Sequence, residues 1–222
     1  MPGYYAENLS AGKLRRCYEI APPAVRAYLD AEINFVVSKL RRSDSVLELG
    51  CGYGRVLGRL LPSARLVFGI DTSLPSLMAA RSERKARLAA MNAVSPGFRN
   101  AVFDVVVCIQ NAVSAFAVDP CALFREAVRI TRPGGLVLFS TYAESFWPER
   151  LAWFEIQAAH GLIGEIDYER TGNGVIVCRD GFRATTITPD GFRELAACVG
   201  IVPALREVGG SSLFCELTVP RR

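Results

Sequence analysis

Several features are scarce in this sequence, and each shortage excludes a class of site. The chain has one histidine, His160, and its seven cysteines include no Cys-x-x-Cys pair. A structural zinc site normally contains such pairs, and an odd number of cysteines does not complete a disulfide framework. We therefore expect reduced thiols and no metal site.

Long hydrophobic runs are also missing. No stretch of 18 or more apolar residues occurs, and the segment from Met1 to Glu7 lacks the basic and apolar regions of a signal peptide. These features predict a cytoplasmic protein with no membrane partner. The net charge is only +4 over 222 residues, and Glu83 interrupts the basic stretch at 81–87. Such a weak, mixed charge does not favour nucleic acid as a partner.

Glycine, in contrast, is concentrated at one informative place. The apolar segment 46–49 leads into Gly50, Gly52 and Gly54, and a second apolar run ends at Asp71. Glycines at alternate positions allow a tight turn and let a ligand approach the backbone closely. A carboxylate at the end of the next strand can accept hydrogen bonds from both hydroxyls of a ribose. The pattern therefore predicts a nucleoside-binding crevice.

The spacing of this loop distinguishes two kinds of nucleoside site. A dinucleotide-binding loop has a further glycine where this chain has Arg55. Preceded by Glu48, the loop instead resembles motif I of the class I S-adenosylmethionine-dependent methyltransferases, specifically their type 11 and type 25 domains. Asp71 matches the ribose-binding acid of that family. Residues 103–107 match its fourth-strand motif, and 132–135 match the turn before its fifth strand, all in the expected order.

The apolar segments alternate in a way that predicts an α/β fold. Strands and helices are expected in turn at 45–49, 56–61, 66–70, 74–88, 103–109, 120–131 and 136–141. This alternation indicates parallel strands with right-handed crossovers. We therefore predict a Rossmann-like, doubly wound, mostly parallel seven-stranded sheet. Strands near 201–208 and 212–219 should form its terminal antiparallel hairpin, as the resemblance also implies.

We interpret residues 1–222 as a single domain with four parts. Residues 1–44 form an N-terminal helical lid, with one helix capped by Ser10 and another opened by two prolines. Residues 45–141 are the cofactor-binding core, and 188–222 the closing helix and hairpin. The part at 142–187 is a small substrate-side insertion. It is expected to hold a helix at 144–161 and a hairpin of strands 165–170 and 175–179, which a run at 182–187 could extend.

The resemblance implies S-adenosyl-L-methionine as cofactor and S-adenosyl-L-homocysteine as product. The positions it assigns to cofactor binding are Glu48, Gly50, Cys51, Gly52, Gly54, Asp71, Thr72, Asn92, Ile109 and Asn111. Some of these have alternative interpretations. Glu48 either orients the amino end of the cofactor or braces the N-terminal helix. Asn92 either accepts a bond from the adenine amino group or belongs to a surface turn, and Asn111 could be a satisfied strand end.

The expected activity is methyl transfer by in-line displacement to an oxygen, nitrogen or sulfur atom of a small molecule. Tyr5, Tyr18 and His160 are the candidate catalytic side chains, although His160 could equally end a helix. Cys121 follows a proline, like the nucleophile of cytosine methyltransferases, but the acidic residue before that proline indicates a helix start instead.

Two alternatives remain open at this point. One is a non-catalytic module that binds the cofactor or a partner. The other is an enzyme acting on a metalloid or thiol acceptor, which would require thiolates gathered at the pocket from Cys17, Cys51, Cys178 and Cys215. A monomer and a homodimer are both compatible with the sequence.

Overall fold

The computed structural model describes residues 4–83 and 86–221, and it contains the predicted sheet. Seven strands lie in the order β3-β2-β1-β4-β5-β9-β8. Their bounds are β1 Ser45–Leu49, β2 Leu66–Asp71, β3 Arg87–Ala90, β4 Phe103–Cys108, β5 Thr131–Tyr142, β8 Ala204–Val208 and β9 Ser212–Thr218. β1 to β5 are parallel, while β9 pairs antiparallel with both β5 and β8. The predicted Rossmann-like fold with a terminal antiparallel hairpin is therefore confirmed.

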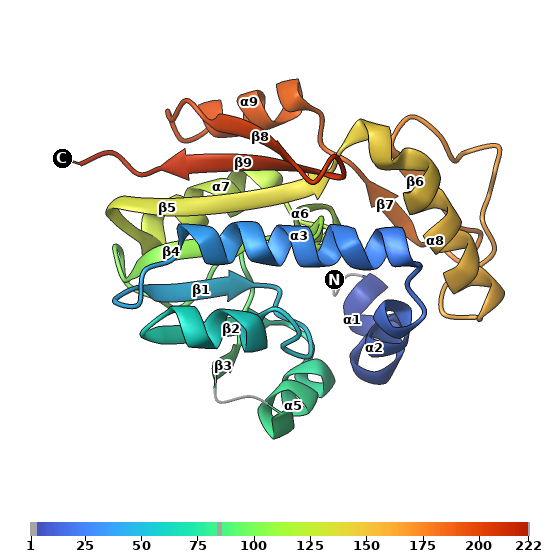
Figure 1. The fold of residues 1–222 in the computed structure, drawn as a ribbon, viewed down its shortest axis with the longest axis horizontal. Coiled ribbons are helices and arrows are strands. Elements are labelled where there is room, and N and C mark those ends of the chain that lie inside the picture. Colours follow the sequence, from blue (N-terminus) through green and yellow to red (C-terminus); the bar gives the residue numbers. More distant parts are fainter. Residues whose placement is uncertain (1–3, 84–85, 222) are drawn as a thin grey trace.

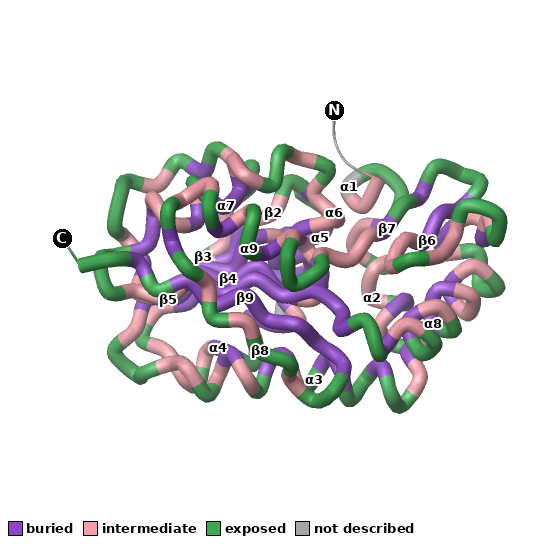
Figure 2. Tube along the Cα trace, turned by 90° about the horizontal axis from the view of Figure 1, so that it is seen from above, coloured by how far each residue is buried: buried purple, intermediate pink, exposed green. Residues whose placement is uncertain are grey.

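Helices cover both faces of this sheet (Figure 1). One layer contains α3 Pro23–Lys39, α4 Leu57–Leu60, a 3-10 turn at Leu61–Ser63 and α5 Leu74–Glu83; the other contains α6 Ala112–Ala115, α7 Pro120–Ile130 and α9 Pro189–Ala197. Successive strand residues point to opposite faces, so Val105 and Val107 pack in the core of α3 and α4, whereas Val106 packs in the core of α7 and α9. Figure 2 shows β4 and β9 buried in the middle of the molecule.

The lid and the insertion pack together beyond the carboxyl ends of the parallel strands, at the right of Figure 1. The lid helices are α1 Tyr4–Asn8 and α2 Ala11–Glu19; the insertion contains a 3-10 turn at Glu144–Phe146, α8 Trp147–Ala159 and the two-stranded sheet of β6 Val175–Val177 and β7 Arg183–Thr185. A third apolar cluster joins these elements, with Cys17, Trp153 and Phe182 among its buried members. In the described part of the chain, no helix has both the length and the apolar character required to cross a membrane.

Two local predictions differ from the structure. The helix predicted at 74–88 ends at Glu83; residues 84 and 85 of the basic stretch lie outside the described residues, and 87–90 form the edge strand β3. The hairpin predicted between 165–170 and 175–179 forms only in part. Its turn is present, with reciprocal backbone bonds of 2.9 Å between Gly172 and Val175, and an antiparallel bridge joins Ile166 to Cys178, but the regular strand β6 pairs with β7 instead.

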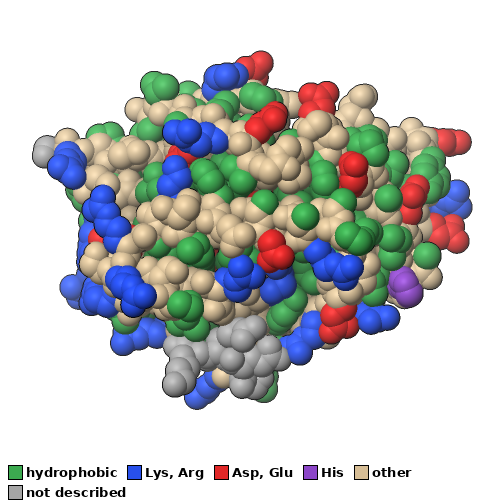
Figure 3. Space-filling model, viewed as in Figure 1, with side chains coloured by type: hydrophobic (Ala, Val, Ile, Leu, Met, Phe, Trp, Pro, Cys, Tyr) green, Lys and Arg blue, Asp and Glu red, His purple; other side chains and the backbone are tan. Residues whose placement is uncertain are grey.

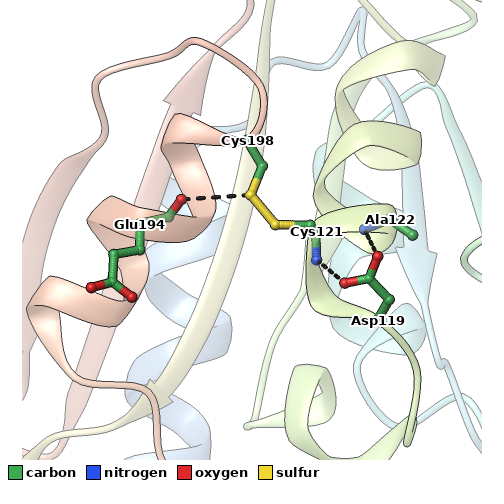
Figure 4. Close-up of a disulfide and its surroundings, with 5 residues drawn as sticks. All are labelled: Asp119, Cys121, Ala122, Glu194 and Cys198. Atoms are coloured by element: carbon green, nitrogen blue, oxygen red, sulfur yellow. Dashed lines mark hydrogen bonds between the residues drawn. A yellow bond between two sulfur atoms is a disulfide. The ribbon is translucent and has the colours of Figure 1, made fainter.

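The prediction that all cysteines are reduced is also corrected. Cys121 at the start of α7 and Cys198 at the end of α9 form a disulfide, with their Cα atoms 5.9 Å apart (Figure 4). α7 begins as predicted, because the Asp119 carboxylate accepts bonds from the N–H groups of Cys121 and Ala122 at 3.0 and 3.3 Å. The thiols of Cys17, Cys51, Cys108, Cys178 and Cys215 are free and buried.

Candidate functional site

A cavity of about 500 Å³ opens where β1, β2 and β4 end, beneath the lid and beside α8. This is the edge at which doubly wound sheets bind their ligands. One half of its lining comes from the loops after these strands, and the other half from α1, α2, the end of β5 and α8. The cavity therefore has a half formed by the loops of the main sheet, which we call the cofactor half, and a half formed by the lid and the insertion, which we call the acceptor half.

The glycine loop forms the floor of the first half. Gly50 and Gly52 have positive φ angles of 75° and 52°, and a Cβ atom at Gly50 would lie 2.5 Å from the Phe116 ring. Asp71 fastens this loop, since its Oδ2 accepts a bond from the Gly52 N–H at 2.8 Å and its Oδ1 one from the Ser73 N–H at 2.8 Å. Each oxygen keeps a lone pair for a ligand. The Asp71 carboxylate is thus held in place beside a loop whose glycines leave the backbone accessible to a ligand.

Glu48 is a buried carboxyl at the base of the cavity. It is 5% exposed, and among the described residues its Oε2 has no hydrogen-bond partner. Burial raises the pKa of Glu48 to about 8; the positive charge of Arg55 opposes this rise and the negative charge of Asp71 adds to it. A cationic ligand group beside Glu48 would favour its ionised form and supply the missing partner.

The chain leaves β4 through two consecutive residues in the left-handed conformation, Gln110 and Asn111, each with a φ of 59°. Such backbone is rare for residues other than glycine and needs support from its surroundings. The Gln110 N–H donates to Glu32 Oε2 at 2.7 Å and to Ser140 Oγ at 2.8 Å. The Gln110 side chain accepts a bond from Arg55, which places both side chains at the cavity wall.

Asn111 lines the cavity, but its amide is used for structure. Its Nδ2 donates to Ser114 Oγ at 2.8 Å and to the Thr185 carbonyl at 2.9 Å, while its Oδ1 accepts from Thr141 Oγ1 at 2.8 Å. These bonds join the end of β4 to β5 and β7. The side-chain amide of Asn111 is therefore already hydrogen-bonded within the protein, and a ligand would contact other atoms of this residue.

Glu32 supports this strained turn from within the protein. It is fully buried, its Oε1 accepts a bond from Ser212, and burial raises its pKa to about 7 against the lowering effect of its hydrogen bonds. The sequence analysis did not identify Glu32, because an acidic residue on an amphipathic helix normally faces solvent. Glu32, directly behind the cavity wall, therefore exchanges its proton near neutral pH.

The second half of the cavity is walled mainly by aromatic side chains. These are Tyr5 from α1, Tyr18 from α2, Tyr142 from β5, and Trp153 and Phe154 from α8. The Trp153 Nε1–H donates to the Cys17 carbonyl at 3.1 Å, so its ring packs against the lid. Burial raises the pKa of both Tyr5 and Tyr18, which keeps their hydroxyls protonated at neutral pH.

The structure brings most of the predicted positions together. The predicted residues that line the cavity are Tyr5, Tyr18, Glu48, Gly50, Cys51, Gly52, Asp71, Thr72, Asn92, Ile109 and Asn111. Gly54 does not line it; with a φ of 82° it turns the loop, and its N–H donates to the Cys51 carbonyl at 2.9 Å. Asn92 Oδ1 accepts a bond from the Val94 N–H at 3.0 Å, so its surface-turn interpretation also describes the geometry.

His160 does not reach the cavity, and its catalytic assignment is corrected. It is exposed at the end of α8, on the surface shown in Figure 3, because the helix stops there and Gly161 turns the chain with a φ of 65°. Only Cys17 and Cys51 of the four thiols considered line the cavity. Burial raises the pKa of the Cys17 thiol to about 12. Within residues 4–83 and 86–221, no cluster of metal-ligating side chains occurs, so the thiolate site for a metalloid acceptor is not formed.

Several cavity residues were missed in the sequence analysis. Arg55 was treated only as a departure from a glycine, yet its guanidinium lies 4.3 Å from the centre of the Tyr18 ring. Gln157 belongs to the predicted inserted helix and follows Trp153 and Phe154 by four and three residues. That i, i+3, i+4 spacing on an aromatic helix is the signal that could have placed Gln157 at the cavity.

Comparison with known proteins adds to this geometry. Residues 47–139 match the family described as "Methyltransferase domain". Over 121 residues, 51% of this chain and 45% of the relative, the chain is 36% identical to malonyl-[acyl-carrier protein] O-methyltransferase of Salmonella typhimurium. It is 30% identical over 107 residues to ubiquinone biosynthesis O-methyltransferase of Paracidovorax citrulli, which covers 43% of this chain and 42% of the relative. The chain thus spans about half the length of the curated relatives it matches.

Solved structures share the fold at low sequence identity. A SAM-dependent methyltransferase from Methanosarcina mazei superposes with a TM-score of 0.63 at 19% identity, covering 85% of this chain and 98% of that one. One from Clostridium acetobutylicum gives 0.64 at 16% identity, covering 93% and 99%. At these identities the similarities show a shared fold.

Proposed function

We propose that the chain is a class I S-adenosylmethionine-dependent methyltransferase, which transfers the methyl group of S-adenosylmethionine to a small molecule by in-line displacement. The observation that carries this proposal is the pairing of the glycine loop with Asp71 at the edge of the cavity. When bound, the sulfonium cofactor supplies an activated methyl group. The protein then has to align the acceptor and exclude water.

The residues of the first half fit this cofactor. We propose that Asp71 accepts hydrogen bonds from the two ribose hydroxyls while it holds the loop through Gly52 and Ser73. Glu48, whose Oε2 has no partner among the described residues, is suited to the cationic amino group of the methionine part. Thr72, Asn92 and Ile109 line the cavity beside these groups, as an adenosine-binding site requires.

A small acceptor is favoured by how the second half is enclosed. The lid is held down at separate places, since Tyr4 donates to Asp180 in the insertion and the Ala11 N–H donates to Ser76 Oγ on α5 at 2.9 Å. Trp153 adds a third attachment through the Cys17 carbonyl. A folded macromolecule could not enter such a space without displacing the lid. Both curated relatives named above are O-methyltransferases by name, which favours oxygen among the possible acceptor atoms.

Two measurements test the proposal in sequence. Isothermal titration with S-adenosylhomocysteine should give micromolar binding, and absence of binding would refute the cofactor assignment. A screen of acceptors with methyl-labelled cofactor should then give a labelled product. Binding without any product across oxygen, nitrogen and sulfur acceptors would favour the alternative, a non-catalytic cofactor-binding module.

A further inference from the structure

Two side chains of α8 have buried polar atoms with no partner in the part of the chain that the structure describes. They are Gln157, through Nε2, and Arg150, through Nε. Gln157 is only 3% exposed and lines the cavity, while Arg150 is fully buried seven residues, about two helical turns, earlier. Buried donors are nearly always hydrogen-bonded. An unpaired amide donor at a cavity wall therefore indicates that a ligand atom accepts its hydrogen bond.

Arg150 places a positive charge behind the same wall. Its Nη1 and Nη2 donate to the carbonyls of Gly174 and Ala184 at 2.8 and 3.1 Å, and no described carboxylate forms an ion pair with it. Its Cζ lies 4.7 Å from the centre of the Tyr142 ring and 5.7 Å from that of Phe154. Both rings line the cavity. A buried cation normally has a counter-charge nearby. Here the Tyr142 ring, which lines the cavity, lies between the Arg150 guanidinium and the cavity.

The other charged groups near the acceptor half do not neutralise this field. Arg55 is a second cation at the cavity wall. Burial raises the pKa of Glu48 to about 8, so at neutral pH this carboxyl is largely uncharged. The Asp71 carboxylate is bound to the loop in the cofactor half. Glu32, behind the wall at the Gln110 turn, is bonded to the Gln110 N–H and to Ser212, and burial raises its pKa to about 7, which favours its uncharged form at and below neutral pH. Tyr5 and Tyr18 stay protonated for the reason given above, so the permanent charges at the acceptor half are the two arginines.

We propose that the acceptor is an aromatic hydroxyl compound, bound as its oxygen anion, with its ring between the aromatic walls and its oxygen accepting a hydrogen bond from Gln157 Nε2. This inference rests on the proposed methyltransferase function. Aromatic side chains from lid and insertion face the ring, and stacked or edge-to-face pairs hold a planar ligand well. The anion supplies the counter-charge that the buried guanidinium of Arg150 lacks.

Other acceptor classes match these groups less well. A carboxylate is best held by a paired donor fork, but the Arg55 guanidinium is occupied by the Gln110 side chain and the Tyr18 ring. An amine is a poor acceptor for the Gln157 amide, and in its cationic form it is repelled by the arginines. A ring-delocalised oxygen anion requires only one donor and a diffuse positive field.

The chemistry balances without a catalytic base. The hydroxyl proton goes to bulk water as the acceptor binds, so protonated Tyr5 and Tyr18 need not receive it. In the transfer the oxygen anion supplies the electron pair of the new O–C bond, and the broken S–C bond leaves its pair on sulfur. The negative charge of the acceptor and the positive charge of the sulfonium cancel.

The test uses 4-nitrophenol with the full chain and no cofactor, because the absorbance of this probe reports its ionisation. In wild-type protein the pKa of the bound probe should fall by about one unit relative to the free probe. Gln157→Leu should weaken probe binding about tenfold or more. Glu155→Leu, which removes an outward polar group of α8 bonded to Tyr168, is the matched control and should bind as wild type. The probe 4-nitroanisole, which lacks the hydroxyl, should not distinguish the three proteins.

If the melting curve shows that Gln157→Leu does not fold, the wild-type protein alone still tests the acceptor class. Tighter binding of 4-nitrobenzoate or 4-nitroaniline than of 4-nitrophenol would overturn the inference, and so would an unchanged or raised probe pKa. A parallel titration with S-adenosylhomocysteine separates the two levels of the argument. Cofactor binding without phenol binding refutes only the acceptor class, whereas loss of cofactor binding refutes the proposed function whatever the phenol does.

Discussion

Asp71→Asn is the sharpest test of how the cofactor half works. The carboxylate accepts from two backbone N–H groups at 2.8 Å each and has one lone pair per oxygen left for a ribose. An asparagine keeps one accepting oxygen, so its amide group must face either Gly52 or Ser73 donor to donor. Charge-assisted bonds contribute about 1.5–3 kcal/mol each, so losing one to two of them should cost about 2–4 kcal/mol of binding. That corresponds to affinity lower by roughly 30- to 1000-fold.

The assay is calorimetric titration with S-adenosylhomocysteine, and Asp119→Asn is its matched control. Asp119 also accepts two backbone N–H bonds, at 3.0 and 3.3 Å, but it caps α7 away from the cavity. Both variants should lose about 1 kcal/mol of folding stability, whereas only Asp71→Asn should lose cofactor affinity. The reasoning is refuted if Asp71→Asn binds within threefold of wild type, or if Asp119→Asn weakens binding equally.

Three further perturbations act on other parts of the structure. Gly50→Ala forces a methyl group into a ring contact at a φ of 75°, so melting and titration should show lower stability and weaker cofactor binding. Gly200→Ala, with a φ of 67° and open space around the methyl group, should lose stability through backbone strain alone and bind the cofactor as wild type does. Because the folded-state pKa of Glu32 is raised from 4.5 to about 7, its stabilising contribution is complete below pH 4.5 and is lost as pH rises to about 7. Urea unfolding at pH 5 and pH 8 should therefore show a fall about 2.5 kcal/mol larger in wild type than in Glu32→Gln. Cys121→Ser should lower the unfolding free energy by about 2–4 kcal/mol under oxidising conditions, with cofactor affinity unchanged.

Each of these has an outcome that contradicts its reasoning. Equal loss in the two glycine variants would mean that backbone strain alone, and not the cavity floor, decides binding. Parallel pH profiles for wild type and Glu32→Gln would show that Glu32 is not protonated on folding. A Cys121→Ser variant as stable as wild type would show that the disulfide does not constrain the unfolded chain.

The cofactor half of the cavity was predictable because its residues follow two strands that are neighbours both in the sequence and in the sheet. Gly50, Gly52 and Asp71 lie on two adjacent strand ends, and parallel strands bring their carboxyl ends to one edge whatever the rest of the chain does. Asn111 shows the limit of that reasoning. Its place at the end of β4 was predicted, but its amide is bonded to Thr185, 74 residues away, a partner that no local pattern indicates.

Pairings over long sequence distances account for the other differences. Cys121 and Cys198 are 77 residues apart, and their proximity follows from how α7 and α9 pack on one face of the sheet. Glu32 lies on the buried stripe of α3, three residues after Leu29 and four before Val36, where Ser212 of β9 donates to it. In each case the partner of the side chain belongs to an element that comes much later in the sequence.

The acceptor half depends on the orientation of α8. The spacing of Trp153, Phe154 and Gln157 places them on one side of this helix, and the hydrogen bond from Trp153 to the Cys17 carbonyl holds that side against the lid, a partner that no local pattern indicates. The same orientation buries Arg150 against the Tyr142 ring and leaves its Nε without a partner in the described chain. The contacts between lid and insertion therefore influence both the shape of the acceptor half and its charge. Specificity in this protein should accordingly change with substitutions in α2 and α8, while cofactor binding stays with the loop after β1.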